Sequence, residues 1–109
     1  MHELSITQSV VEAVTVRTGD SPVARVTVRV GRLSGVVPEA MQFCFELVTA
    51  GTPLAGATLD IEQPAGRGHC RSCDQQFVLT DLILLCACGS ADVEVLAGRE
   101  LAVAAVELA

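Results

Sequence analysis

The chain has 109 residues, of which 7 are basic and 13 acidic, so its formal net charge is −6 at neutral pH. This length corresponds to about one domain. The acidic balance argues against a surface for nucleic-acid phosphates, which needs clustered Lys and Arg. All seven basic residues are Arg, and they are scattered along the chain.

No stretch of the sequence has the pattern of a membrane or export segment. The longest apolar run covers residues 82–88, whereas a membrane helix needs roughly 18 apolar residues. The first sixteen residues contain Glu3 and Glu12 but no Lys or Arg, unlike a signal peptide. We therefore expect a cytoplasmic chain with no membrane partner, whose five cysteines are thiols or metal ligands rather than disulfides.

The first part of the chain predicts a helix followed by a strand. Apolar and small residues recur at helical spacing over residues 4–18, at Leu4, Thr7, Val11 and Val14. Ser5 and Gln8 fit a capping box, although the helix could begin a residue or two earlier, and the sequence 19–22 ends the helix. Residues 24–31 alternate Val with Arg or Thr, which is typical of a half-buried strand.

A second helix and two more strands follow. Pro38 suits the first turn of a helix that ends near Ala50, with an apolar face of Met41, Cys44, Phe45 and Val48. Cys44 is interpreted as a small core residue. Residues 57–63 alternate as a strand, and residues 99–108 predict a last strand, with a helix as the runner-up because of the alanines.

These elements predict an α/β (α+β) fold of two helices on a small three-stranded sheet, with an inserted zinc-ribbon module. Residues 1–65 and 99–109 would form the α/β domain. Residues 66–98, which begin within the Pro- and Gly-rich boundary at 64–68, would form a cysteine module.

Four cysteines form two close pairs, Cys70-x-x-Cys73 and Cys86-x-Cys88, separated by twelve residues. Two thiolate pairs on tight turns are the usual way to build a tetrahedral zinc site, and four filled positions make such a zinc structural. A short hairpin from residues 76–79 and its return would join the pairs, and Gly89 would give the second turn its freedom.

Two other interpretations of this module stay open. One thiol of the irregular second pair could be buried, with His69 or Asp74 completing the zinc site. Alternatively, Cys70 and Cys73 could form a redox pair, but such pairs begin a helix. The residues after Cys73 have the pattern of a strand.

The N-terminal sequence Met1-His2-Glu3 offers a chelating group. The free amine, the His2 backbone nitrogen and the His2 imidazole can bind one ion, and such nitrogen donors suit Ni(II) or Cu(II). The fourth donor would be the Glu3 backbone nitrogen, its carboxylate or water. Taken alone the signal is weak, because a terminal His is usually just a frayed residue.

Four segments give the sequence a family resemblance. They are the opening Met1-His2-Glu3-Leu4-Ser5, the central residues 31–40 and 43–46, the two cysteine pairs followed by Gly89 and Ser90, and the closing Gly98-Arg99-Glu100-Leu101. In their order and over nearly the whole chain, they resemble the HypA/HybF family of hydrogenase-maturation nickel metallochaperones.

The resemblance implies a nickel site at Met1, His2 and Glu3, and a zinc site at Cys70, Cys73, Cys86 and Cys88. The second pair lacks one residue of the family's usual spacing. Ni(II) would be a transient cargo and Zn(II) a structural ion. The implied partners are a HypB-type nickel GTPase and the precursor of a nickel-iron hydrogenase large subunit, with urease served by some relatives. A homodimer is a further assembly to consider.

The alternative function is a zinc-ribbon adapter that binds another protein without nickel transfer. An enzyme is not expected, because no Ser, His and Asp set has a supporting motif and His69 is the only histidine besides His2. The three classes differ in one observable: only the metallochaperone requires nickel binding that depends on the free amine and His2.

Overall fold

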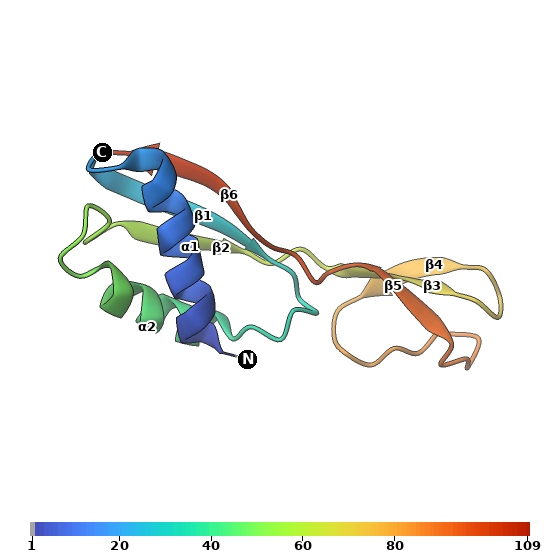
Figure 1. Cartoon of the computed structure of the whole chain (residues 1–109). Coiled ribbons are helices and arrows are strands. Elements are labelled where there is room, and N and C mark those ends of the chain that lie inside the picture. The colour runs from blue at the N-terminus through green and yellow to red at the C-terminus, as the bar shows by residue number, and fades with distance from the viewer. Residues whose placement is uncertain (1) are drawn as a thin grey trace. The chain divides into compact units, whose positions relative to one another are not determined.

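The computed structural model describes residues 2–109 and divides into two compact units (Figure 1). The first unit comprises residues up to Arg29, Val36–Glu62 and Ala102–Ala109. The second comprises Val30–Gly35 and Gln63–Leu101. Residues 30–35 thus pack with the cysteine-rich unit, which the sequence pattern does not indicate. The domain boundaries at 65/66 and 98/99 stay predictions.

Helix α1 (Glu3–Thr18) buries one narrow face. Its buried residues Thr7, Val11 and Val14 recur at intervals of three and four, as the sequence predicted. The capping-box prediction was wrong: the N-cap is His2, without a side-chain hydrogen bond, so Ser5 lies inside the first turn. The Thr7 hydroxyl instead donates to the Glu3 carbonyl, 2.6 Å away.

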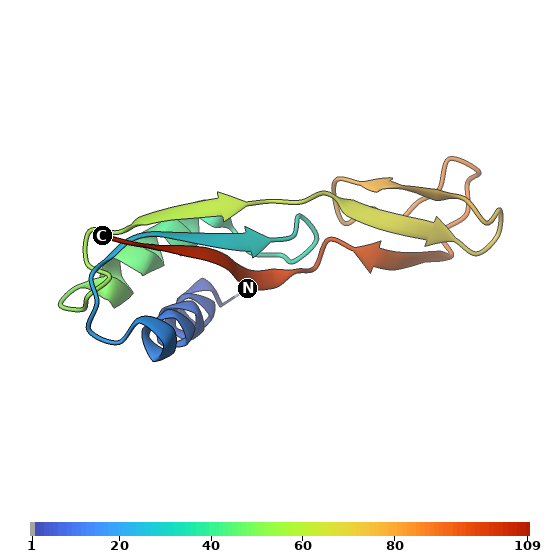
Figure 2. The ribbon, with the colours of Figure 1, turned by 90° about the horizontal axis from the view of Figure 1, so that it is seen from above.

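The sheet of the first unit has the order β2-β1-β6, from β2 (Thr58–Glu62), β1 (Val23–Val30) and β6 (Leu101–Leu108). Strands β1 and β2 are parallel, with Val26 opposite Leu59. Strand β6 runs antiparallel to β1, as Figure 2 shows. The predicted three-stranded sheet is therefore confirmed, and residues 101–108 form a strand rather than the runner-up helix.

Both helices lie on one face of this sheet (Figure 2). Helix α2 (Pro38–Thr49) begins at Pro38 as predicted, and it packs against α1. Met41 and Phe45 are buried on its inner face together with Thr49, whereas Cys44 is half-buried. On the sheet, Val26, Val28 and Val30 are buried while Arg25 and Arg29 are exposed. In residues 2–109 no helix is long and apolar enough to cross a membrane.

The second unit is a three-stranded antiparallel sheet in the order β4-β3-β5. Its strands are β3 (Gly66–Cys70), β4 (Gln76–Leu79) and β5 (Val93–Ala97). The expected hairpin was wrong in its pairing, because β4 returns along β3 and the second cysteine pair lies in the loop between β4 and β5. Strand β3 begins where the Pro- and Gly-rich sequence 64–68 predicts a boundary, because its two glycines are typical of a loop.

Those glycines are required by close packing. A Cβ atom on Gly68 would lie 2.9 Å from Val93 Cγ1 and 3.0 Å from Leu79 Cδ1. A Cβ atom on Gly31 would collide with the carbonyl of Gly98. Leu33, from the residues just after β1, is buried in the same cluster as Leu79 and Val93. The core of the second unit is therefore completed by a residue distant in sequence.

Candidate metal centre

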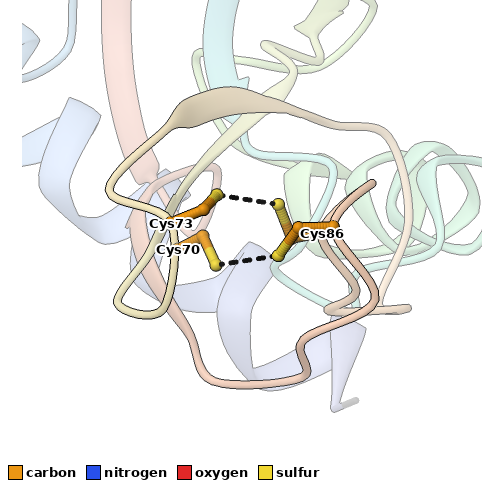
Figure 3. A group of neighbouring side chains, drawn as sticks. Cys70, Cys73 and Cys86 are labelled. Carbon is orange, nitrogen blue, oxygen red and sulfur yellow. Dashed lines mark hydrogen bonds between the residues drawn. The ribbon is translucent and has the colours of Figure 1, made fainter.

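The four cysteines of the two pairs converge in the second unit (Figure 3). Their sulfur atoms all lie within 4.8 Å of one another. Cys70 Sγ is 3.7 Å from Cys88 Sγ, and Cys73 Sγ is 3.6 Å from Cys86 Sγ. Four sulfurs around zinc at about 2.3 Å would be roughly 3.8 Å apart in a tetrahedron. The donor set therefore fits a zinc ion in both chemistry and spacing.

Backbone hydrogen bonds shape the two turns that present the thiols. In the first, the Asp74 N–H donates to the Cys70 carbonyl at 2.8 Å, and Asp74 has a φ of 63°. In the second, the Gly89 N–H donates to the Cys86 carbonyl at 2.9 Å, and Gly89 has a φ of 93°. A positive φ costs little for Gly and is tolerated by Asp. The shorter Cys86-x-Cys88 spacing is thus accommodated by a turn that Gly89 closes.

The surroundings of the thiols separate their acidities. Backbone N–H groups of Cys73 and Ser72 lower the pKa of Cys70 to about 6. For Cys73, the Gln75 N–H lowers the pKa, but the neighbouring thiols, Cys86 first, and desolvation raise it to about 12. For Cys88, the Ser90 N–H lowers the pKa, but the Cys86 and Cys70 thiols together with desolvation raise it overall. Without a cation, one thiolate therefore suppresses the ionisation of its neighbours.

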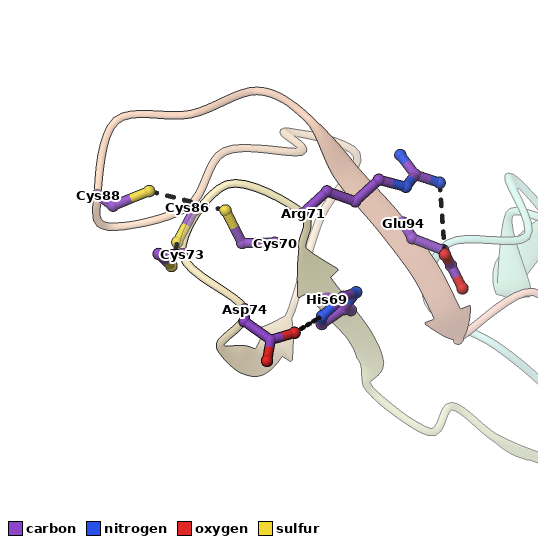
Figure 4. A network of polar contacts seen from close by, with 8 residues as sticks. All are labelled: His69, Cys70, Arg71, Cys73, Asp74, Cys86, Cys88 and Glu94. Carbon is purple, nitrogen blue, oxygen red and sulfur yellow. Dashed lines mark hydrogen bonds and ion pairs between the residues drawn. The ribbon is translucent and has the colours of Figure 1, made fainter.

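His69 and Asp74, the alternative ligands considered from the sequence, contact each other (Figure 4). His69 Nε2 lies 2.6 Å from Asp74 Oδ1, and neither residue belongs to the cluster of four sulfurs. The thiol pair Cys70 and Cys73 lies at the end of β3 and in the following turn, not at the start of a helix. The geometry therefore supports four thiol ligands over a mixed set or a redox pair.

Two further contacts, which the sequence did not reveal, join the turns. The Ser72 and Ser90 hydroxyls are 2.8 Å apart, so a residue between Cys70 and Cys73 contacts the second residue after Cys88. Arg71 donates through Nη1 to Asp92 at 2.8 Å and through Nη2 to Glu94 at 3.4 Å. These partners are far apart in sequence, so only the folded sheet brings them together.

The predicted nickel residues lie at the start of α1. Met1 is outside the described residues. His2 is exposed, and its carbonyl accepts a hydrogen bond from the Ile6 N–H at 3.2 Å. The Glu3 carboxylate accepts a hydrogen bond from the Val37 N–H at 3.1 Å, and this bond is the main reason that the Glu3 pKa is lowered. The Glu3 side chain is thus already engaged, which the sequence could not show.

Comparisons with known proteins indicate the same family over nearly the whole chain. A family model described as "Hydrogenase/urease nickel incorporation, metallochaperone, hypA" matches residues 1–108. The hydrogenase maturation factor HypA of Geotalea uraniireducens is 49% identical over 109 residues, covering 99% of both chains. The HypA of Nostoc punctiforme is 40% identical over 108 residues, covering 99% of this chain and 96% of that one.

A solved structure shares the fold. The solution structure of the Ni metallochaperone HypA from Helicobacter pylori aligns with a TM-score of 0.66 at 24% identity, covering 99% of this chain and 97% of that chain. The matching model and the relatives span both the N-terminal residues and the cysteine cluster. The chain therefore belongs to the HypA family of hydrogenase/urease nickel-incorporation metallochaperones.

Proposed function

We propose that this chain carries Ni(II) as cargo at Met1, His2 and Glu3 and delivers it during maturation of a nickel-iron hydrogenase. The observation that carries the proposal is the family match, which begins at residue 1 and so includes the terminal residues. Exposure of His2 supports it, because an ion held at an exposed terminus can exchange with another protein's ligands. As a carrier, the chain would act in the cytoplasm and would not be an enzyme.

The nitrogen donors of the terminus would hold the ion. The amine, the His2 backbone nitrogen and the His2 imidazole form adjacent chelate rings, and nitrogen donors of this kind favour Ni(II) in a square-planar or tetragonal arrangement. Because the Glu3 carboxylate already accepts the Val37 N–H, we assign Glu3 to the site through its backbone nitrogen. Loss of amide protons makes nickel binding stronger as the pH rises.

Cys70, Cys73, Cys86 and Cys88 would hold a structural Zn(II). Four thiolates complete a tetrahedral coordination sphere, so this ion leaves no position for a substrate. Bound zinc would replace the sulfur–sulfur hydrogen bonds with four metal–sulfur bonds and hold the two turns together. The second unit has a small core, and a metal is a common means of stabilising a unit of this size.

The partners that we propose are a HypB-type nickel GTPase and the large-subunit precursor of the hydrogenase. The exposed position of His2 supports transfer by ligand substitution, in which a partner's donors replace those of the terminus one at a time. Urease is the alternative destination named in the family description. A transfer assay from nickel-loaded chain to each purified partner separates these destinations.

The test of the nickel site exploits the absence of Lys from the chain. Without Lys, the terminal amine is the only primary amine, so an acetylating reagent blocks it selectively. Calorimetry on untagged protein with its native Met1 would compare the unmodified chain, the acetylated chain and His2→Ala. We expect nickel binding to be lost in both altered forms while zinc content is retained.

His69→Ala is the matched control, because His69 is the only other histidine. It should bind nickel as the unmodified chain does. Equal binding in all four forms would remove the terminus from the mechanism. A zinc-ribbon adapter without nickel transfer would then be the better account.

A further inference from the structure

The arginines of this chain fall into two groups by their partners. Three of them form ion pairs with carboxylates of neighbouring segments: Arg25, Arg29 and Arg71. Within residues 2–109 no ion pair is made by the other four, which are all exposed: Arg17, Arg32, Arg67 and Arg99. Of these four, Arg17 lies on α1, whereas the remaining three all belong to the second unit. In a chain with 13 acidic and 7 basic residues, such a group of unpaired arginines points to an external anion.

Two of these arginines are held next to each other by backbone hydrogen bonds. The residues on either side of Arg32 donate N–H bonds of 2.8 and 2.7 Å to the carbonyls of Glu100 and Gly98. Those two acceptors are the residues on either side of Arg99. The backbones of Arg32 and Arg99 are therefore fixed side by side. Two guanidinium groups on adjoining segments repel each other, and an anion bound between them removes that repulsion.

A third exposed arginine lies beside this pair. Arg67 is opposite Ala97 in the pairing of β3 with β5, two residues before Arg99. A Cβ atom on Gly98 would lie only 2.6 Å from the Gly66 Cα atom, so the residues that precede Arg99 and Arg67 are in close contact. The charge of Arg67 therefore adds to the positive potential around the other two arginines.

The acidic residue nearest in sequence does not pair with these arginines. Glu100 follows Arg99 directly, but it is half-buried and its carboxylate accepts a hydrogen bond from the Gly98 N–H at 2.6 Å. Arg32 donates through Nε to the Gln63 carbonyl at 3.4 Å, and this contact leaves both of its Nη groups for a ligand. The local positive charge is thus not neutralised from within the second unit.

The donors that remain favour carboxylate over phosphate as the anion. Phosphate sites in loops are commonly built from unengaged backbone N–H groups that form a nest around the oxygens. Here the N–H groups of residues 31–34 all donate to backbone carbonyls, and the Gly98 N–H donates to Glu100. The guanidinium groups are left, and each can donate two parallel N–H bonds to a planar carboxylate. An extended acidic segment can offer one carboxylate to each of them.

We infer that Arg32 and Arg99, with Arg67 beside them, form a docking surface for an acidic segment of a partner protein. Neighbouring Asp or Glu side chains of that segment pair with the guanidinium groups. Because the chain carries a net charge of −6, the rest of its surface repels such a segment and so directs it to these arginines. The surface uses neither the terminal residues nor the thiols, so its test is separate from that of nickel delivery.

The test is a titration of the zinc-loaded full chain with a capped hexaglutamate peptide at low ionic strength, followed by NMR. The Nε–Hε signals of Arg32 and Arg99 should shift, whereas those of Arg25 and Arg71 should not, because their guanidinium groups are already paired. The dissociation constant of the peptide should rise about fivefold in Arg32→Gln and in Arg99→Gln, the upper range for an exposed ion pair. High salt should abolish the binding.

Arg17→Gln is the matched control, because Arg17 is also exposed and forms no ion pair within residues 2–109. It changes the net charge by the same amount, yet its affinity for the peptide should stay close to that of the unmodified chain. Circular dichroism and zinc content verify that every variant is folded. An equal loss of affinity in all three variants would mean that the peptide responds to net charge alone, which would overturn the inference. Unshifted Arg32 and Arg99 signals would overturn it as well.

Inorganic phosphate is the second probe, and it tests the choice of anion. At concentrations where the peptide saturates the chain, phosphate should leave the Arg32 and Arg99 signals in place. Shifts of equal size with phosphate would assign the surface to phosphate groups and reject the acidic segment as its occupant.

Discussion

The Val37 N–H donates a hydrogen bond to Glu3 Oε2 at 3.1 Å, which joins the first residue of α1 to the residue before α2. Glu3 is thereby joined to the chain segment that leads into α2. The same contact lowers the Glu3 pKa, because the N–H stabilises the ionised carboxylate.

We predict that Glu3→Gln removes a pH-dependent part of the stability. Because the folded chain holds the Glu3 pKa below its unfolded value, the stabilisation is fully present above the unfolded pKa, which is about 4.3. It is lost as the pH falls through the folded pKa. Urea unfolding should be measured between neutral pH and pH 3. At neutral pH the free energy of unfolding should be larger for the unmodified chain than for Glu3→Gln, and this difference should disappear in acid.

Glu12→Gln, at an exposed position on the same helix, is the control for this measurement. Its free energy of unfolding should change with pH in the same way as that of the unmodified chain. A gap between Glu3→Gln and the unmodified chain that stays constant with pH would show that the Val37 contact does not depend on the carboxylate charge.

Removal of zinc is predicted to unfold the second unit while the first stays folded. The core of the second unit includes two of the proposed ligands, Cys70 and Cys86, whereas the first unit has its own core around Met41 and Phe45. A chelator should collapse the amide NMR dispersion of residues 66–97 and leave the signals of α1 and α2 in place. Added zinc should reverse the change.

Substitution of single cysteines tests the same site. Cys73→Ser should lower zinc affinity at least a hundredfold, because loss of a ligand is more severe than the 10- to 100-fold loss typical of its supporting contacts. Cys44→Ser should bind zinc normally, because the fifth cysteine lies on α2 and outside the cluster of four sulfurs. Zinc retained by Cys73→Ser at full affinity would exclude Cys73 as a ligand.

Zinc binding at neutral pH is predicted to release at least two protons. The pKa of Cys73 is raised to about 12 and that of Cys88 is raised as well, so both thiols are protonated before zinc binds. Cys70, with a pKa of about 6, is already a thiolate. Calorimetry in buffers of different ionisation enthalpy gives directly the number of protons that are released when zinc binds. Zinc affinity should fall with acidification, and release of no protons would contradict a four-thiolate site.

Gly31→Ala is predicted to destabilise the zinc-loaded chain by about 2 kcal/mol or more, the range of costs for overpacking. Its new Cβ would collide with the Gly98 carbonyl, and backbone cannot move aside as a flexible side chain can. Gly51→Ala is the comparison: nothing lies within 4 Å of its Cβ, but its φ of 76° disfavours Ala. It should cost roughly 1 kcal/mol in urea unfolding, and an equal cost at both sites would refute the close approach.

Periodicity in the sequence was sufficient to predict the helices and strands of the first unit. The Val and Arg alternation of β1 and the helical spacing of Thr7, Val11 and Val14 each reflect burial on one face, which the structure confirms. Strand β3 could not be found in this way. Gly66 and Gly68 stand where neighbouring atoms leave no room for a side chain, so the strand has the composition of a loop.

In the candidate site, too, the sequence predicted the features that depend on local structure and missed those that depend on the folded chain. The spacing of the cysteine pairs indicated which residues would meet, because a few residues of local turn determine each pair. The contact between Glu3 and Val37 had no signal in the sequence, since it joins a side chain to a backbone N–H 34 residues away. The pattern of β6 predicted a strand but not its exposure, because exposure depends on what the rest of the fold leaves uncovered.

Leu33 has a consequence for anyone who would transplant the cysteine module. A metal-binding cassette that moves between proteins by recombination carries its whole interior in one continuous stretch of sequence. Here the interior includes Leu33, whose side chain occupies the space beside Gly66 and Gly98. A chimaera built from residues 66–98 alone would inherit all four thiols yet leave that space empty. The heritable unit is discontinuous, and grafting it requires residues 30–35 as well.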